Sequence, residues 1–84
     1  MLKVSVSSPE RMLFEGEATH VIAPAIDGFV GILENHAPMM TLLGRGELRL
    51  DGGGGAGRRF TVSGGFLQVV DNHVRIVTES AEAR

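Results

Sequence analysis

The sequence predicts an all-β domain, a flattened sandwich or barrel of about nine to ten short strands. Short segments alternate apolar and polar residues with a period of two, which is typical of half-buried strands. Turn residues interrupt these segments roughly every 6 to 12 residues, and no segment shows the long period of an amphipathic helix. The chain has 84 residues, enough for one domain with a small core.

The first part of the chain predicts three strands, over residues 2–7, 12–18 and 20–24. Gly16 predicts a bulge or a bend in the second strand, because glycine inside a strand often marks one. Pro24 predicts the end of the third strand, because proline cannot donate a ladder hydrogen bond. A turn over residues 25–28 is expected to follow, since Asp-Gly is a strong turn dipeptide.

Residues 27–38 carry the most irregular pattern in the chain: two glycines in an apolar run, then three polar residues, then Ala-Pro. Gly28 and Gly31 can adopt backbone angles that are closed to other residues, or let another backbone come close. Pro38 fixes its own φ and pushes the residue before it towards extended geometry. We therefore expect a strand that starts sharply and ends in a rigid corner. Binding groups are often carried on such corners, so function is predicted here.

The second half of the chain predicts five more strands, over residues 39–43, 47–51, 59–63, 66–70 and 73–78. Turns or loops are expected between them, at residues 44–46, 52–57, 63–65 and 71–72. The last residues, 79–84, predict a short helical turn or a frayed end, because they are too few for a stable helix. The alternation places these side chains in the core: Leu2, Val4, Val6, Val21, Ala23, Leu48, Leu50, Phe60, Val62, Val74 and Ile76.

Composition excludes several classes of protein. The net charge of −2 and the pI near 5.8 argue against a nucleic-acid surface, which is normally basic. The absence of cysteine excludes disulfides, a thiolate nucleophile and a zinc–thiolate site. No apolar run reaches the roughly 20 residues that a membrane-spanning helix needs. The alternation begins too early for a signal peptide, so we expect a cytosolic protein or one bound to a partner that faces the cytosol.

No catalytic, metal or cofactor site is predicted. His20, His36 and His73 are far apart in the sequence and none has ligand spacing. Ser63 lacks the strand-to-helix elbow that activates a serine nucleophile. Residues 52–57, a glycine-rich segment followed by Arg58 and Arg59, are expected to form a hairpin loop and not a phosphate-binding loop, because the latter needs a helix N-terminus behind it.

Four apolar side chains beside the corner have two interpretations. Ile26, Phe29, Met39 and Met40 exceed what a core with two alternating faces needs, and a flexible methionine pair suits an adaptable interface. The other interpretation is that all four fill the core.

Residues 28–38 resemble the G-x-x-G-I-L-P-x-H-A-P segment of the epsilon subunit of bacterial and chloroplast F-type ATP synthases, which is called delta in mitochondria. Residues 63–69 resemble the S-G-G-x-x-x-V corner of that family, and residues 2–9 and 13–16 resemble its opening hairpin. The resemblance covers nearly the whole chain, and two ordered motifs at the family spacing make it specific.

This resemblance implies a flattened β-sandwich that serves as a rotor part, with no active site, cofactor or metal of its own. Such a subunit lies at the foot of the central stalk, bridges the gamma subunit and the membrane ring of c subunits, and transmits torque between proton flow and ATP chemistry. The implied location is peripheral, on the cytoplasmic face of the inner membrane.

The resemblance also implies two contact surfaces and a set of structural turns. The gamma subunit is expected to contact Ser8, Glu34, Asn35, His36, Met39 and Met40. The c-ring is expected to contact Ala25, Ile26, Asp27, Gly28 and Phe29. Structural turns are expected at Gly31, Pro38, Gly64 and Gly65. Phe29 and Met40 are the expected apolar anchors of the interfaces.

Two departures from the family pattern carry expectations of their own. Glu34 stands where the family commonly has proline, which predicts a less rigid corner. The sequence stops at Arg84, whereas the family usually continues into a two-helix domain that inhibits ATP hydrolysis and in some members binds ATP, so we expect no ATP binding. The alternative function is a stand-alone β-barrel that binds a peptide or a small ligand; a small hydrolase is the weakest hypothesis.

Overall fold

The computed structural model describes residues 1–53 and 57–83, and in this part of the chain it contains ten strands and no α-helix. The predicted all-β class is therefore confirmed. The strands, in chain order, are β1 (Leu2–Ser7), β2 (Met12–Ala18), β3 (His20–Ala25), β4 (Gly28–Leu33), β5 (Met39–Leu42), β6 (Arg45–Asp51), β7 (Arg58–Ser63), β8 (Phe66–Val70), β9 (His73–Val77) and β10 (Ser80–Ala83).

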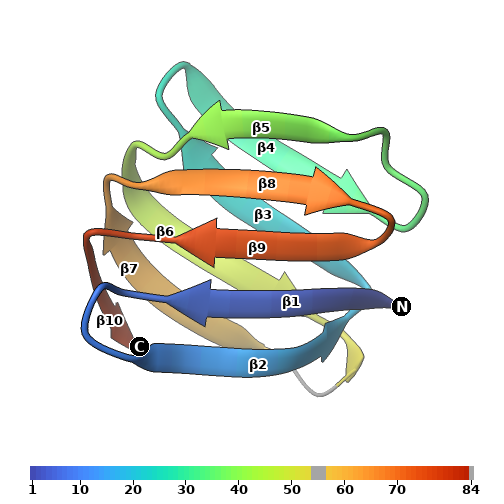
Figure 1. Cartoon of the computed structure of the whole chain (residues 1–84), viewed down its shortest axis with the longest axis horizontal. Coiled ribbons are helices and arrows are strands. Elements are labelled where there is room, and N and C mark those ends of the chain that lie inside the picture. The colour runs from blue at the N-terminus through green and yellow to red at the C-terminus, as the bar shows by residue number, and fades with distance from the viewer. Residues whose placement is uncertain (54–56, 84) are drawn as a thin grey trace.

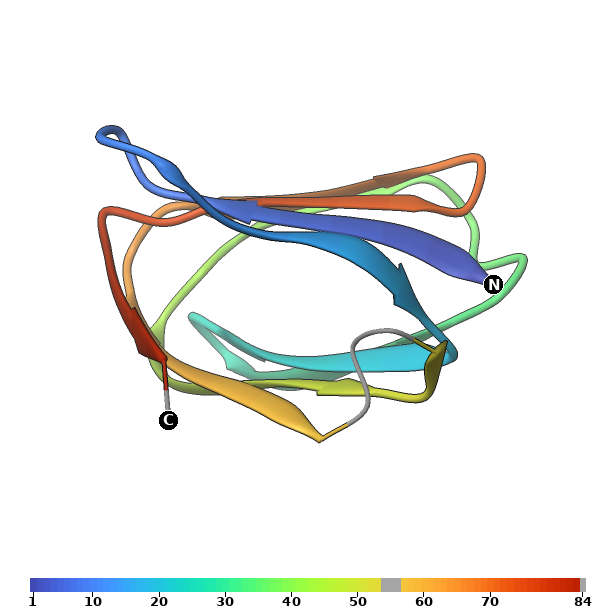
Figure 2. The same ribbon diagram turned by 90° about the horizontal axis from the view of Figure 1, so that it is seen from below.

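The strands form two five-stranded sheets that pack face to face as a sandwich. The front sheet has the order β2-β1-β9-β8-β5, and the back sheet has the order β10-β7-β6-β3-β4. All neighbours are antiparallel except β1 and β9, which run parallel. Figure 1 shows the front sheet lying across the back sheet, and Figure 2 shows the two layers from the edge. Strands β4 and β5 are the edges on one side, and β2 and β10 are the edges on the other.

The core lies between the sheets, because each strand directs every second side chain inward. From the front sheet Val4 and Val6 are almost fully buried, and from the back sheet Leu48 and Leu50 face them from the opposite layer. All the side chains that the alternation places inside are buried. The hairpin between β8 and β9 is also confirmed: Asp71 and Asn72 have φ values of 48° and 63°, as a two-residue turn of type I′ requires.

The last strand corrects a prediction. Residues 80–83 do not form a helical turn or a frayed end; they form β10, which pairs antiparallel with β7 from Ser80↔Ser63 to Ala83↔Phe60. The outer edge of β7 offers unpaired backbone groups, and a four-residue segment gains more from such a ladder than from a single helical turn.

Of the bulge or bend predicted at Gly16, the bulge is wrong. Gly16 pairs regularly with Val4, and the register shift in this hairpin falls next to the turn, between Val6 and Ser7. Gly16 is needed for packing, because a Cβ there would lie 2.9 Å from the ring of Phe14. That ring sits 6.5 Å from the ring of Phe60, so the missing side chain makes room for an aromatic pair in the core.

Pro24 does not end its strand, which continues to Ala25. Pro24 lies opposite Phe29 in the β3–β4 ladder, at a position where the pair exchanges no hydrogen bonds, so the missing N–H costs nothing. Its carbonyl instead accepts a hydrogen bond from Gly44 N–H at 2.8 Å on the other side of the strand. The turn predicted over residues 44–46 is shorter than expected, since β6 already begins at Arg45.

The corner between β7 and β8 is built on Gly64 and Gly65, as predicted. Their φ values are 72° and 102°, and a Cβ on Gly65 would collide with the carbonyl of Val77. Thr78, which is 1% exposed, closes the corner. Its hydroxyl oxygen lies 3.0 Å from the Gly64 carbonyl and 2.9 Å from that of Ser80, so its one proton is shared between these two acceptors. Of the predicted glycine loop, residues 54–56 lie outside the described part of the chain.

Candidate docking surfaces

The apolar side chains singled out beside the corner are mostly at the surface. Phe29, Ile26 and Met40 are 69%, 66% and 64% exposed, whereas Met39 is partly buried and packs against the core. The interpretation that all four fill the core is therefore wrong. Three of them are free to contact another protein.

Two further leucines belong to the same exposed set. Leu33 on β4 and Leu42 on β5 are 62% and 58% exposed, and the sequence interpretation did not single them out. The signal was present, because Leu33 shares the outward face of β4 with Phe29, and Leu42 shares that of β5 with Met40. Both edge strands on this side of the sandwich therefore carry outward apolar side chains.

We call residues 25–29 the tip, because they surround the turn between β3 and β4. Ile26 and Asp27 form its two-residue loop, and Gly28 follows with a φ of 129°, which a residue with a side chain rarely adopts. The Ile26 N–H donates to the carbonyl of Leu42 at 3.2 Å, which ties the tip to β5 in the other sheet. The tip thus presents apolar side chains and one carboxylate from a fixed base.

We call residues 34–38 the corner; they connect β4 to β5. Asn35 has a φ of 64°, and its N–H donates to the side-chain oxygen of Asn72 at 2.6 Å. The Glu34 carboxylate lies 3.1 Å from the amino group of Met1. These contacts hold the corner against the β8–β9 turn and the beginning of β1. All five corner residues except His36 are exposed.

His36 combines a structural contact with one available ring atom. The backbone N–H of His36 donates to the Leu33 carbonyl at 3.3 Å and so closes the turn after β4. Its Nδ1 lies 2.7 Å from the carbonyl of Ala37. A carbonyl only accepts, so Nδ1 donates in this contact, which leaves Nε2 for another contact. Pro38 comes two residues after His36 and directly precedes the first residue of β5.

Ser8 lies far from the rest of the surface that the resemblance assigns to the gamma subunit. It follows the last residue of β1, whereas Glu34 contacts the residue before β1, and a six-residue strand is about 20 Å long. Figure 1 shows the β1–β2 turn and the corner at opposite ends of the sandwich. The Ser8 hydroxyl accepts from the N–H groups of Glu10 and Arg11 at 3.4 and 3.3 Å, so it stabilises its own turn.

Gly31 is not a turn residue. It lies in the middle of β4, pairs with Ile22, and has no positive φ. A Cβ built on it meets nothing within 4 Å. Gly31 therefore leaves a notch on the outward face of β4 between Phe29 and Leu33. The expected strand with a sharp start and a corner at its end is otherwise confirmed.

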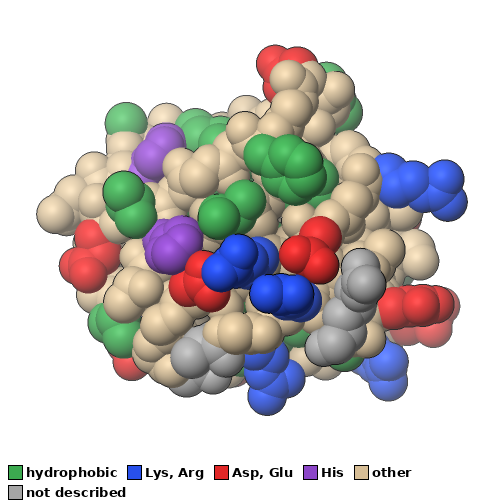
Figure 3. Space-filling view, turned by 180° about the vertical axis from the view of Figure 1, so that it is seen from behind, with side chains coloured by type: hydrophobic (Ala, Val, Ile, Leu, Met, Phe, Trp, Pro, Cys, Tyr) green, Lys and Arg blue, Asp and Glu red, His purple; other side chains and the backbone are tan. Residues whose placement is uncertain are grey.

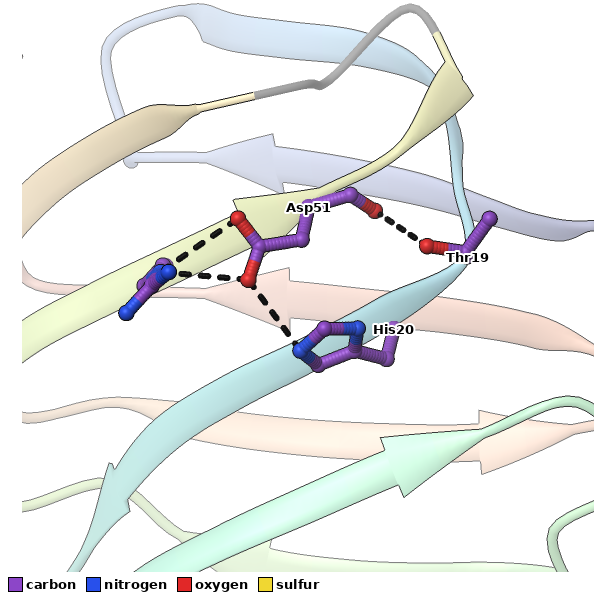
Figure 4. A network of polar contacts seen from close by, with 4 residues as sticks. Thr19, His20 and Asp51 are labelled. Atoms are coloured by element: carbon purple, nitrogen blue, oxygen red, sulfur yellow. Dashed lines mark hydrogen bonds and ion pairs between the residues drawn. The ribbon is translucent and has the colours of Figure 1, made fainter.

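A polar network on the back sheet was not predicted. Figure 4 shows His20 from β3 and Thr19 beside it meeting Asp51 at the end of β6. The His20 Nε2 and the Arg49 Nε both lie 3.1 Å from the Asp51 carboxylate, and the Thr19 hydroxyl donates to the Asp51 carbonyl at 2.9 Å. Thr19 and Asp51 are 32 residues apart, so no local sequence signal could have paired them. The network fixes the register of β3 on β6.

The outer face of the back sheet is divided by type of side chain. In Figure 3 hydrophobic side chains lie over β3 and β4, and acidic and basic side chains gather below them, over β6 and β7. The apolar part includes Phe29 and Leu33, and the charged part includes Arg49 and Asp51. The apolar half of this face is continuous with the tip.

The described residues contain no group of three His, Cys, Asp or Glu side chains able to hold a metal ion. A shallow hollow of about 800 Å³ lies on the outer face of the front sheet; the residues that line it include Lys3, Glu15, Glu17 and Arg75. Within residues 1–53 and 57–83 no helix has the length and apolar character to cross a membrane.

Known proteins resemble this chain over its whole length. The family model for the β-sandwich domain of the ATP synthase delta/epsilon chain matches residues 1–84. The ATP synthase epsilon chain of Syntrophomonas wolfei is 42% identical over 79 residues, which are 94% of this chain and 58% of that protein. The epsilon chain of Solibacter usitatus is 43% identical over 81 residues, 96% of this chain and 60% of that protein. This chain thus spans about 60% of the length of these relatives.

A shorter relative and two solved structures complete the comparison. The ATP synthase epsilon chain of Chlorobium limicola is 36% identical over 92% of this chain and 88% of its own length. A chain of the Euglena gracilis mitochondrial ATP synthase superposes with a TM-score of 0.88 at 24% identity, covering 98% of this chain and 52% of that one. A chain of the Tetrahymena thermophila mitochondrial ATP synthase superposes with a TM-score of 0.74 at 19% identity, covering 96% of this chain and 65% of that one. These two structures share the fold. The chain belongs to the family of β-sandwich domains of the ATP synthase delta/epsilon chain.

Proposed function

We propose that the domain is a non-catalytic part of the central stalk of a proton-translocating F-type ATP synthase. In this role it links the gamma subunit to the c-ring and couples proton transport to ATP synthesis. Family membership supports the assignment. The two structures with the same fold were determined within assemblies described by their F1 and c-ring or central-stalk and c-ring parts. The implied place is the cytoplasmic face of the inner membrane, peripheral and held by the complex.

The observation that carries the proposal is an exposed apolar tip fixed to a stiff scaffold. Ile26 and Phe29 lie in water in the free domain, yet the turn that carries them is bonded to both sheets. A sandwich packed to crystal-like density deforms little, so a force applied at one end reaches the other. Exposed apolar side chains on such a base are suited to anchor an interface that must bear load.

The two contact surfaces divide by position. The tip, residues 25–29, is proposed to contact the c-ring. The corner, with Glu34, Asn35 and His36, and β5, with Met39 and Met40, are proposed to contact the gamma subunit. Ser8 can belong to the same contact only if the gamma subunit extends along the length of the sandwich, because Ser8 lies at the end opposite the corner.

Removal of the Phe29 ring tests the tip. Phe29→Ala should weaken capture of a gamma–c-ring subcomplex at least tenfold, because a central aromatic anchor typically contributes more than 1.4 kcal/mol. The fold should be unaffected, since the ring is mostly exposed. Thr61→Ala, an exposed position on β7, is the matched control. Equal capture of wild type and Phe29→Ala would remove Phe29 from the interface.

The rotor assignment itself is tested with the wild-type chain. A tagged copy expressed in its own cell should purify with the gamma and c subunits from solubilised membranes. Purification without any ATP synthase subunit would overturn the assignment.

A further inference from the structure

The free edge of β4 has its main-chain groups and side chains arranged to accept another strand. The opposite edge strand of the same sheet, β10, carries the charge of Glu82, and β2 carries Glu15 and Glu17, as edge strands do when they must resist pairing. β4 carries no charge, no proline and no bulge in its six residues. Its edge is therefore unprotected.

The register shows which groups the edge offers. Pro24 has no N–H, and its carbonyl bonds to Gly44 on the side away from β4, so Pro24 and Phe29 form a non-hydrogen-bonded pair. Hydrogen-bonded and non-hydrogen-bonded pairs alternate along an antiparallel ladder, so every second residue of β4 directs its main-chain groups away from β3. The N–H and C=O groups of Phe29 and Gly31, and the N–H of Leu33, therefore point to the free edge. The Leu33 carbonyl already accepts from His36 at 3.3 Å. An added strand could thus make five main-chain hydrogen bonds.

The side chains around this edge favour an apolar occupant. Phe29 and Leu33 are 69% and 62% exposed on one face, and Gly31 between them leaves the notch described above. A branched apolar side chain opposite Gly31 would fill the notch, contact both neighbours and remove them from water.

The charges at the two ends of β4 select the kind of strand. Asp27 precedes the strand and Glu34 follows it, so both ends of the edge are acidic. A second copy paired antiparallel about Gly31 would bring Asp27 of each chain within one residue of Glu34 of the other, and like charges at both ends would oppose it. A strand with Lys or Arg at its ends would gain from the Asp27 carboxylate at one end and, at the other, from that of Glu34, which the amino group of Met1 already contacts at 3.1 Å.

We propose that β4 accepts by strand addition an extended apolar segment of another protein, flanked at both ends by basic residues. The contact is made through the edge groups of Phe29, Gly31 and Leu33. Main-chain hydrogen bonds supply the affinity and the Gly31 notch supplies the selectivity. Strand addition at this edge does not require the rotor role, so either proposal can fail without the other.

The test uses the blocked peptide Lys-Thr-Val-Ile-Val-Thr-Lys and the ¹⁵N-labelled chain, read by NMR. In the free chain the amides of Phe29 and Gly31 should exchange quickly, and those of Val30 and Ile32 slowly. Saturating peptide should slow exchange at Phe29, Gly31 and Leu33. The same peptide with Glu at both ends should bind about tenfold more weakly.

Gly31→Lys is the decisive variant, because a side chain there meets open space and the φ is ordinary, so the fold should be kept. It should weaken the peptide at least tenfold, and Thr61→Lys, with the same charge change on the same face of the sheet, should not. Absence of saturable binding, protection at other amides, or equal binding by Gly31→Lys would each overturn strand addition. Loss of peptide binding with intact capture of the gamma and c subunits would leave the rotor proposal in place.

Discussion

The corner between β7 and β8 and the corner between β4 and β5 both carry the chain from the back sheet to the front sheet, yet they are held in opposite ways. Gly64 and Gly65 are closed by Thr78, whose hydroxyl is buried and bonded to backbone carbonyls. The corner at residues 34–38 is closed by exposed groups, among them the Asn72 amide. Burial of the closing group distinguishes a corner that is sealed into the fold from one that is left at the surface.

The tip extends this contrast. It belongs to the β3–β4 hairpin of the back sheet and is bonded to β5 of the front sheet through Ile26, but the side chains of Ile26 and Phe29 do not enter the core. Such a segment adds little to stability and leaves its apolar area available. Changes at the buried corner should therefore cost more stability than changes at the exposed corner or the tip.

The largest expected effect is that of Gly65→Ala. The φ of 102° is strained for alanine, and the new Cβ would collide with the carbonyl of Val77, so the free energy of unfolding should fall by about 3 kcal/mol or more. Urea unfolding followed by circular dichroism measures it. Gly31→Ala is the control, because its Cβ meets nothing, and it should lose no stability. A loss below 1 kcal/mol for Gly65→Ala would contradict the structure of this corner.

Thr78→Val should have the next largest effect. Valine keeps the shape but removes the hydroxyl, which leaves the Gly64 and Ser80 carbonyls without this donor and costs about 1 to 3 kcal/mol. Thr61→Val removes an exposed hydroxyl from β7 and should change the unfolding midpoint little. If both variants unfold at the same urea concentration, Thr78 does not hold the corner.

Asn72→Gly should have the smallest effect on stability. Glycine keeps the positive φ of 63° but removes the oxygen that accepts from Asn35 N–H at 2.6 Å. The bond is exposed, so the expected loss is about 0.5 to 1 kcal/mol. Hydrogen exchange at the Asn35 amide should nevertheless become much faster, while that of the buried strands stays the same. Unchanged exchange at Asn35 would show that other contacts hold the corner.

Particular residues show how far the sequence could be interpreted. The alternation from Leu2 to Val6 and from Leu48 to Leu50 was enough to predict which side chains enter the core, because successive side chains of any strand point to opposite faces. The prediction that Pro24 ends its strand was wrong. Whether a proline ends a strand depends on which side its missing N–H faces, and the register with Phe29 sets that side. The segment from Ser80 to Ala83 misled because its partner, β7, lies far back in the chain.

The candidate docking surfaces, too, could be predicted from the sequence only in part. The G-x-x-G and Asn-His-Ala-Pro pattern was sufficient to locate the tip and the corner, since glycine permits backbone angles that other residues avoid and proline fixes its own φ. It could not show that Ser8 lies at the opposite end from Glu34, or that Gly31 forms a notch on a free edge. Those depend on which strands are neighbours.

By itself, the sequence determined the all-β class, the inward residues, the glycine corner and the family, because period, turn chemistry and motif spacing are properties of short segments. Tertiary structure alone decided that β1 and β9 run parallel, that Thr78 closes a corner, that His20 meets Asp51, and that β4 is left as an edge. The physical reason is that each of these contacts joins segments distant in the chain, and the choice among them depends on the free energy of packing the two sheets as a whole.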